Sequence, residues 1–331
     1  MVSLFPATAM ITLKQLRYFE AVARRLHFGR AAEECGISQP ALSQQISELE
    51  AALGLPLLER AARRIALTPM GEDIAARAER ILGDVRDLTD FARHGGAVLA
   101  GVLRLGVIPS VAPYLLPRIL PLVEESYPAL ELQLRETRTD QLRDELLQGR
   151  LDALLMALPA GDGALVSRPL FADRFLLARR AEAVAEDEAP LTGPDAIPHE
   201  RLLLLEEGHC LRDQALAFCH IQKSELKAGF GSSSLTTIMQ MVANGYGVTL
   251  LPEICTEVEA RDPRITLTRF TAPEPQREIG LVWRRGSPRR ADFEAFGALV
   301  MRAMQSGDAR ALPSRGNQKQ ARKTQQQGTV R

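Results

Sequence analysis

The sequence predicts an α/β protein with a helical N-terminal domain followed by a larger domain built on a β-sheet. Apolar residues recur at helical spacing over residues 13–95. After Gly101 the pattern changes to short apolar or alternating runs that are separated by helical segments. The chain has 331 residues, of which 46% are hydrophobic, so each domain can bury a core of its own.

The overall composition excludes several classes of protein but does not decide about nucleic acid. The 41 Lys and Arg residues balance the 41 Asp and Glu residues, so only a local basic patch could indicate DNA. No apolar run reaches the ~18 residues of a membrane span, and no secretory signal precedes the first helix. Four cysteines do not form a disulfide framework, which predicts a reducing, cytoplasmic location. No Cys or His pair has metal-ligand spacing, so neither a metal nor a cofactor is expected.

The N-terminal domain is expected to contain three short helices and one long helix. Ser38 and Pro40 open the third helix as N-cap and first-turn proline, and Thr68 caps the long one. An Arg-rich extended segment separates these two helices, and Gly95-Gly96 with Gly101 marks a hinge. The helices are expected over residues 13–26, 28–34, 39–53 and 69–93, and the extended segment over 57–68.

The larger domain begins with a β-α-β-α-β order, which predicts a mostly parallel sheet. Its strands are expected over 102–108, 130–136 and 152–158, with helices over 115–125 and 140–148. A second block follows, with strands over 175–178, 202–205, 247–252 and 278–283 and helices over 211–219, 234–244 and 292–305. Residues 307–331 are basic and almost without apolar side chains, which predicts a disordered tail.

The first three helices have the arrangement of a helix-turn-helix, whose second helix presents its first turns to DNA bases. Short polar side chains on those turns suit the major groove, and arginines around them suit phosphates. Arg24, Arg25 and His27 add charge nearby. The alternative is a plain three-helix bundle with a solvated polar face. The expected DNA-binding residues are Ser38, Gln39, Pro40, Ser43 and Gln44 for bases, and Arg30, Arg60, Arg63 and Arg64 for the backbone.

Cys210 and Cys219 lie at opposite ends of one expected helix. Nine residues of helix span about 13 Å, whereas a disulfide needs Cα atoms within about 7 Å. The pair can therefore form a bridge only if the helix unwinds. Cys210 lies at the helix N-terminus beside His209 and near Arg212, a setting that favours the thiolate. The alternative is two ordinary buried cysteines, as expected for Cys35 and Cys255.

The segments FGRAAEECGISQPALSQQISELEAALGLPLLER and LTPMGE resemble the winged helix-turn-helix of LysR-type transcriptional regulators. The resemblance extends over about residues 11–305. It implies a dimerising linker helix and a two-lobed, periplasmic-binding-protein-like effector domain. It also implies double-stranded promoter DNA and RNA polymerase as partners, and a homotetramer built as a dimer of dimers.

The expected domains follow from this resemblance. They are a leader (1–9), a DNA-binding domain (10–68), a linker helix (69–96), an effector domain (101–306) and a basic tail (307–331). Lobe I is expected over about 101–166 and 274–306, and lobe II over about 167–273.

The segments GHCLRDQALAFC, IPSVAPYLLP and REIGLVWRRGSP are similar to hydrogen-peroxide sensors within the same family. That similarity implies that Cys210 reacts with peroxide and that Cys219 is its disulfide partner. It implies a peroxide pocket with Thr139, His209 and Arg277, and with Ser110 where the sensors have threonine. Without it, Ser110 and Thr139 could be helix caps and Arg277 a surface charge. Asp213 either orients His209 or Arg212, or only favours the first helical turn.

The predicted function is a peroxide-sensing, DNA-binding regulator that activates antioxidant genes and is not an enzyme. One alternative is a LysR-type regulator that binds a small metabolite in the crevice between the lobes. A thiol peroxidase is a third hypothesis, but such an enzyme has no use for a helix-turn-helix.

Overall fold

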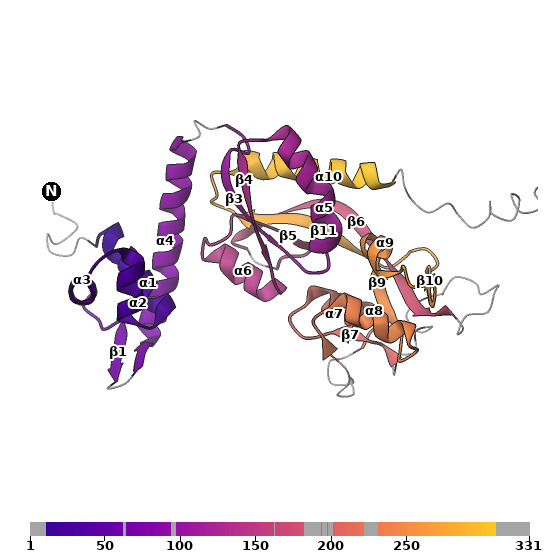
Figure 1. The fold of residues 1–331 in the computed structure, drawn as a ribbon, viewed down its shortest axis with the longest axis horizontal. Helices are drawn as coiled ribbons and strands as arrows, with labels where there is room; N and C mark the ends of the chain where they lie inside the picture. Colours follow the sequence, from indigo (N-terminus) through magenta and orange to yellow (C-terminus); the bar gives the residue numbers. More distant parts are fainter. Residues whose placement is uncertain are drawn as a thin grey trace, which may run out of the picture.

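The computed structural model describes residues 11–61, 64–93, 97–161, 163–181, 201–221 and 231–308, with positions 193 and 197. The expected leader lies outside these residues, as does the expected tail apart from 307 and 308, which end the last helix. Figure 1 shows a small N-terminal domain, a long helix beside it, and a larger two-lobed domain.

The N-terminal domain packs three helices, α1 (Leu13–Arg25), α2 (Phe28–Cys35) and α3 (Gln39–Leu53), around one apolar core. The Ser38 hydroxyl caps α3 as expected, by accepting a hydrogen bond from the Ala41 amide at 3.4 Å. The Arg-rich segment is an antiparallel hairpin of β1 (Leu58–Ala61) and β2 (Arg64–Leu67). The structure thus has the three helices and the wing that the sequence predicts.

The long helix α4 (Pro69–Arg93) joins the two domains. It begins at the cap that the sequence predicts, because the Thr68 hydroxyl accepts a hydrogen bond from the Gly71 amide at 2.9 Å. In its first half, Ala78 is buried in the core of the N-terminal domain. Further along, Asp87 is buried against the effector domain through an ion pair with Arg284. The helix therefore contacts both domains of its own chain.

The main sheet has the order β10-β6-β11-β5-β3-β4, with β9 also paired to β6. Only β3 (Gly101–Val107), β4 (Leu130–Glu136) and β5 (Ala153–Ala157) run parallel to one another. The expectation of a mostly parallel sheet is wrong beyond these three, because the later strands enter the sheet antiparallel. They are β6 (Leu165–Arg180), β9 (Thr249–Pro252), β10 (Ile265–Thr268) and β11 (Gln276–Arg284).

The effector domain has two separate apolar cores, one in each lobe. Helices α5 (Ala112–Ser126), α6 (Thr139–Leu147) and α10 (Arg290–Asp308) pack on lobe I. Helices α7 (Cys210–Phe218) and α8 (Leu235–Ala243) pack on lobe II, with the short β7 (Leu204–Leu205) and β8 (Gly231–Ser232). Smaller elements of lobe II are a 3-10 turn, Glu253–Cys255, and α9 (Thr256–Glu259).

Two strand predictions differ from the structure in length. The strand expected at 175–178 lies in the second half of the 16-residue β6, whose first half is interrupted by Ser167, Arg168 and Pro169. Of the strand expected at 202–205, Leu204 and Leu205 form β7. Leu202 makes an isolated bridge with Val248 instead. β6 pairs with β11 in lobe I and with β9 and β10 in lobe II, so it connects the lobes.

None of the helices that the structure describes is long and apolar enough to cross a membrane.

Candidate nucleic-acid interface and cysteine crevice

The first turns of α3 present polar side chains outward from a fixed helix. Leu42, Ile46 and Leu49 are buried and hold the opposite face of α3 in the core. Ser43 is half-buried, and Gln44 donates a hydrogen bond to Glu48 at 3.0 Å. The exposed residues of these first turns are Ser38, Gln39, Pro40, Ala41 and Gln44.

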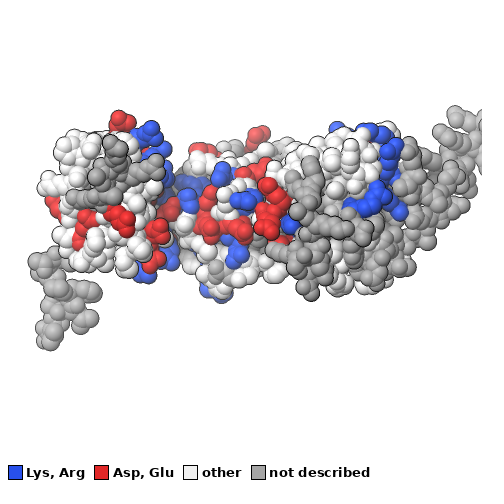
Figure 2. Space-filling view, turned by 90° about the horizontal axis from the view of Figure 1, so that it is seen from below, with Lys and Arg blue, Asp and Glu red and all other residues white. Residues whose placement is uncertain are grey.

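The arginines expected at the DNA backbone differ in their surroundings. Arg30 is exposed, whereas Arg24 and Arg25 both bind the carboxylate of Glu34. Arg60 and Arg64 belong to the hairpin strands, although the description does not extend to their side chains, and Arg63 lies outside the described residues. On the face shown in Figure 2, acidic and basic side chains lie side by side over the middle of the molecule.

The two cysteines at the ends of α7 face different lobes. Cys210 is the first residue of the helix, is half-buried and packs against the core of lobe I. Cys219 follows the last turn, is 1% exposed and belongs to the core of lobe II. Both thiols are free. The intact helix therefore keeps the two sulfur atoms apart, as its length predicts.

The Cys219 thiol is a weaker acid than a free cysteine because it is buried among apolar side chains. Desolvation raises the pKa of the Cys219 thiol to about 11. Cys219 therefore stays protonated near neutral pH while α7 is folded. Cys210, by contrast, is partly open to solvent at the positive end of the same helix.

His209 precedes Cys210 and is 5% exposed. Burial, assisted by the nearby Arg138 guanidinium, lowers the pKa of His209 below its usual value, although Glu206 opposes this. The imidazole is therefore neutral near pH 7, and its Nε2 atom has no hydrogen-bond partner among the described residues.

A turn from lobe I lies against the residues that precede Cys210. Arg138, just before α6, donates a hydrogen bond to the Glu207 carbonyl at 3.3 Å. Gly208 has a φ of +89°, and a Cβ atom there would lie 3.1 Å from Arg138 Cδ. Thr139, the next residue in lobe I, has a buried hydroxyl without a partner among the described residues. The contact brings the start of α6 to the start of α7, and the region around Thr139, His209 and Cys210 is called the crevice from here on.

Neither Ser110 nor Thr139 is a helix cap, so that alternative is wrong for both. The N-cap of α5 is Val111 and that of α6 is Arg138, and neither makes a side-chain cap. Ser110 is buried after β3, and Thr139 is the first residue of α6. Both hydroxyls remain available for other contacts at the ends of parallel strands.

Arg277 is buried, so the alternative of a surface charge is wrong. Its Nη1 donates to Ser110 Oγ at 2.8 Å, and its Nη2 donates to the Ser110 carbonyl at 3.0 Å. Its Nε donates to Asp173 Oδ2 at 2.9 Å, and Nη2 lies 2.8 Å from the same oxygen. Sequence reasoning missed Asp173, because only the β6–β11 register places it opposite Arg277.

Asp213 is exposed on the first turn of α7, where a negative charge stabilises the helix N-terminus. Arg212 donates instead to the Leu205 carbonyl at 2.9 Å. Within the described residues, no group of three or more His, Cys, Asp or Glu side chains could hold a metal ion.

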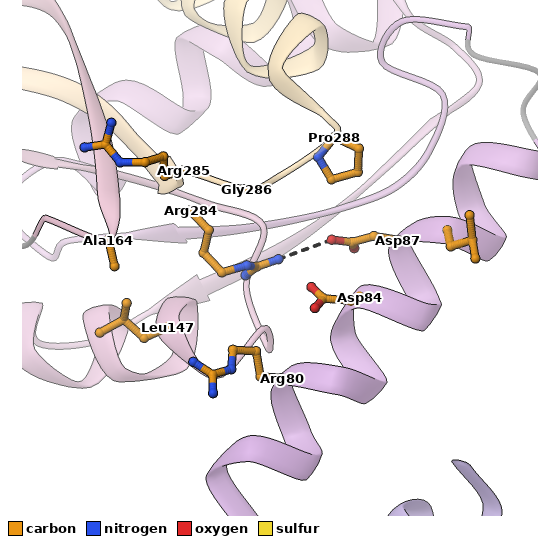
Figure 3. Close-up of a pocket in the computed structure, with 10 residues that line it drawn as sticks. Arg80, Asp84, Asp87, Leu147, Ala164, Arg284, Arg285, Gly286 and Pro288 are labelled. Carbon is orange, nitrogen blue, oxygen red and sulfur yellow. Dashed lines mark hydrogen bonds and ion pairs between the residues drawn. The ribbon is translucent and has the colours of Figure 1, made fainter. Parts of the chain in front are cut away.

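The far end of lobe I, away from α7, contacts the linker helix. Arg284 of β11 donates to the carbonyls of Leu146 and Leu151 at 2.7 and 2.6 Å, and to Asp87 of α4 at 3.2 Å. Figure 3 shows the Arg284–Asp87 contact at the edge of a cavity of about 610 Å³ between α4 and lobe I. Burial raises the pKa of Asp87, as does the nearby Asp152, while Arg284 opposes the rise.

Two glycines allow α4 and the end of α6 to approach backbone to backbone. A Cβ atom at Gly83 would lie 3.3 Å from both the Cα and the carbonyl oxygen of Gly149. Arg86 adds a hydrogen bond to the Gly149 carbonyl at 3.3 Å. Helix α6 thus begins at the crevice, with Thr139, and ends at the linker helix, and Figure 1 shows it between α4 and α7.

The chain is similar in sequence and in structure to known bacterial regulators. The chain is 47% identical over 300 residues to a probable hydrogen peroxide-inducible genes activator of Streptomyces viridosporus, covering 88% of this chain and 94% of that protein. It is 39% identical to the DNA-binding transcriptional dual regulator OxyR of Escherichia coli, covering 90% and 97%. A full-length OxyR variant from Pseudomonas aeruginosa has a TM-score of 0.72 at 36% identity, covering 88% and 98%.

Two family models together cover most of the chain. Residues 13–72 match the bacterial regulatory helix-turn-helix protein, lysR family, and residues 96–305 match the LysR substrate binding domain. The winged helix-turn-helix, the long linker helix and the two-lobed effector domain are the architecture that this match requires. The chain therefore belongs to the LysR family of bacterial helix-turn-helix regulators.

Proposed function

We propose that this protein is a transcriptional regulator that senses hydrogen peroxide through Cys210 and binds double-stranded promoter DNA through α3 and the wing. One observation carries the proposal. Cys210 lies half-buried at the start of α7, where Thr139 Oγ1 and His209 Nε2 are buried and have no hydrogen-bond partner among the described residues. Buried polar atoms normally have partners, so such a pair is a site for a small polar ligand. Relatives described as peroxide-inducible activators support the choice of ligand.

The redox step follows from the chemistry of the two cysteines. The Cys210 thiolate attacks one peroxide oxygen, the O–O bond breaks, and the hydroxide that leaves takes up a proton to become water. Cys210 is then a sulfenic acid, and the Cys219 sulfur attacks it to form the disulfide with release of a second water. Ser110 and Thr139 donate hydrogen bonds to the peroxide oxygens, and the positive charge of Arg277 stabilises the hydroxide.

The disulfide requires a conformational change, because α7 separates the cysteines. Leu211, Ala215 and Leu216 are buried on this helix, so unwinding it exposes apolar surface. Burying a large apolar side chain is worth roughly 1.5–3 kcal/mol. The oxidised state is therefore strained and easily reduced, which suits a reversible signal.

The signal reaches DNA through lobe I and the linker helix. Both α6 and β11 extend from the crevice to the α4 contact, with Thr139 and Arg277 at one end and Gly149 and Arg284 near the other. A change at α7 can therefore shift α4 relative to lobe I. We place the regulator in the cytoplasm, as a homotetramer of two dimers that engages RNA polymerase and activates antioxidant genes.

Thiol counting tests the redox part. Reduced full-length protein is treated with low peroxide, and the remaining thiols are assigned by peptide mass. We expect two thiols to disappear, Cys210 and Cys219, while Cys35 and Cys255 persist. Cys210→Ser should lose none, and Cys219→Ser should stop at one oxidised cysteine. Unchanged thiols in the wild-type protein would contradict the proposal and favour a metabolite in the crevice, the second candidate.

Salt-dependent DNA binding tests the nucleic-acid part. Gln39→Ala should reduce discrimination between operator and scrambled DNA by ~1–3 kcal/mol, because its side chain is exposed on the recognition turn. Arg30→Ala should weaken binding to both DNAs about equally and flatten the salt dependence. Equal losses on both DNAs for Gln39→Ala would contradict base reading at this position.

A further inference from the structure

We propose that Asp173 is a positioning residue for the peroxide reaction, which fixes Arg277 and, through Arg277, the hydroxyl of Ser110. The proposal rests on the peroxide-sensing function inferred above. It adds a residue that lies on neither of the segments that carry the cysteines and the pocket hydroxyls.

The geometry makes Asp173 the counter-ion that orients Arg277. The two residues are directly opposite each other on the antiparallel strands β6 and β11, and both side chains are almost fully buried. One carboxylate oxygen of Asp173 accepts a hydrogen bond from Arg277 Nε at 2.9 Å and lies 2.8 Å from Arg277 Nη2. A guanidinium held along this edge has a fixed plane, so its remaining Nη1 points in one direction only.

That direction is toward Ser110, and it determines where the serine proton can point. Arg277 Nη1 donates to Ser110 Oγ at 2.8 Å, and a guanidinium has no acceptor to offer in return. The Ser110 proton must therefore point away from Arg277. A peroxide oxygen can accept it, and a donor at that oxygen stabilises the negative charge that develops as the O–O bond breaks.

Asp173 also ties this arrangement to lobe II. Its second carboxylate oxygen accepts a hydrogen bond from the Ile254 amide at 3.1 Å. The neighbouring Cys255 thiol donates to the Ser110 carbonyl at 3.7 Å. Ser110 lies between Ile108 and Val111 of the lobe I core, whereas Cys210 begins a helix that packs on the lobe II core. Asp173 therefore helps to set the position of the Ser110 hydroxyl relative to the reacting sulfur.

The experiment compares two reactions of Cys210 in reduced full-length protein. Peroxide oxidation needs the positioned hydroxyl, whereas alkylation by iodoacetamide needs only an accessible thiolate. Asp173→Asn keeps the shape of the side chain and removes its charge. We expect the peroxide rate constant to fall roughly 10-fold to 100-fold, as when an oriented donor is lost, with the iodoacetamide rate within about 2-fold. The matched control is Asp262→Asn, which removes a half-buried acid of lobe II that pairs with Arg264 away from Arg277 and should change neither rate.

A double-variant cycle tests whether Asp173 acts through Arg277. If it does, Asp173→Asn combined with Arg277→Met should be no slower than Arg277→Met alone, because the effects of coupled residues do not add. Multiplied losses would overturn the proposal, as would parallel losses of the peroxide and iodoacetamide rates, which indicate a structural role.

Two further measurements distinguish a failure of this proposal from a failure to fold and from a failure of the proposed function. If Asp173→Asn does not fold, Asp173→Glu keeps the charge and displaces it by one methylene, and its peroxide rate should still fall with the iodoacetamide rate preserved. Wild-type protein whose Cys210 does not react with peroxide contradicts the proposed function. Wild-type protein that reacts, with variants at Asp173 that react equally fast, contradicts only the role of Asp173.

Discussion

The crevice and the linker contact lie at opposite ends of the same elements, α6 and β11, and particular side chains in the two places differ in whether they are paired. At the linker, Arg284 satisfies two carbonyls and the Asp87 carboxylate, and Gly83 and Gly149 approach backbone to backbone. In the crevice, Thr139 Oγ1 and His209 Nε2 are buried and find no partner in the part of the chain that the structure describes. Since an unpaired buried polar atom costs stability, we infer that the linker contact stabilises the fold, whereas the crevice offers polar atoms to the ligand proposed above.

The comparison predicts the largest loss of stability at the linker end, for Arg284→Ala. The substitution leaves the buried Asp87 carboxylate without its ion pair, and breaking a buried pair in this way costs about 3–5 kcal/mol. Urea unfolding followed by the fluorescence of Trp283, the single tryptophan, measures the loss in lobe I.

The neighbouring Arg285 provides the control for this prediction. Its side chain is exposed and, among the described residues, donates hydrogen bonds to the Gly163 carbonyl at 3.1 Å, so Arg285→Ala should cost less than about 1 kcal/mol. Equal losses for the two variants would contradict the structural role given to the linker contact.

Gly83→Ala should have the next largest effect, and should separate docking from helix stability. Alanine is the better helix former, but its Cβ would press on the Gly149 backbone, and overpacking of this kind costs typically 1–3 kcal/mol. Hydrogen exchange should show weaker protection of the α4–α6 contact, and oxidation should alter the DNA footprint less than in wild type.

Ala76→Ser is the control for Gly83→Ala. It adds one heavy atom at an exposed position of the same helix and should leave both readouts unchanged. A normal footprint response in Gly83→Ala would show that the signal does not pass through this contact.

His209 should make stability depend on pH in a defined direction. Its pKa is lowered in the folded state, so below the ordinary value of 6.5 the unfolded chain binds more protons than the folded one. Stability should therefore fall as pH decreases below 6.5, by at most about 1.4 kcal/mol for each pH unit. His209→Gln should flatten the slope between pH 7 and pH 5 in unfolding experiments, and an unchanged slope would contradict a buried neutral imidazole.

Thr139→Val should have the smallest effect on stability and a clear effect on reactivity. The two side chains have similar shapes, and no described residue hydrogen-bonds to the hydroxyl that is lost, so the cost should stay below about 1 kcal/mol. The peroxide rate of Cys210 should nevertheless fall, because a donor to the bound oxygen is missing. A rate equal to that of wild type would show that the unpaired hydroxyl is not part of the peroxide site.

The DNA-binding end was predictable from sequence because its signals are local. The Ser38 and Thr68 hydroxyls cap helices through amides only three residues ahead, and the buried face of α3 follows helical spacing. The separation of Cys210 and Cys219 was also predictable, because the rise of a helix is fixed by its geometry. Which side chains contact bases and which contact the DNA backbone stays a prediction.

The crevice needed both the sequence and the tertiary structure. Sequence patterns alone left Ser110, Thr139 and Arg277 as possible caps or a surface charge, and the family resemblance pointed to a pocket. The structure decided against the caps and the surface charge by showing what each side chain contacts. The roles in peroxide binding stay predictions that the variants above test.

The sequence by itself determined the helix-turn-helix, its caps, the α/β character of the effector domain and the two ends of α7, since each depends on residues close together in the chain. Only the tertiary structure decided the antiparallel entry of β6 and β11, the pairing of Asp173 with Arg277 across 104 positions, and the placement of the two cysteines against different cores. Strand register and the packing of one lobe on another depend on contacts between distant segments, and the local pattern of a sequence carries no information about which distant segments will meet.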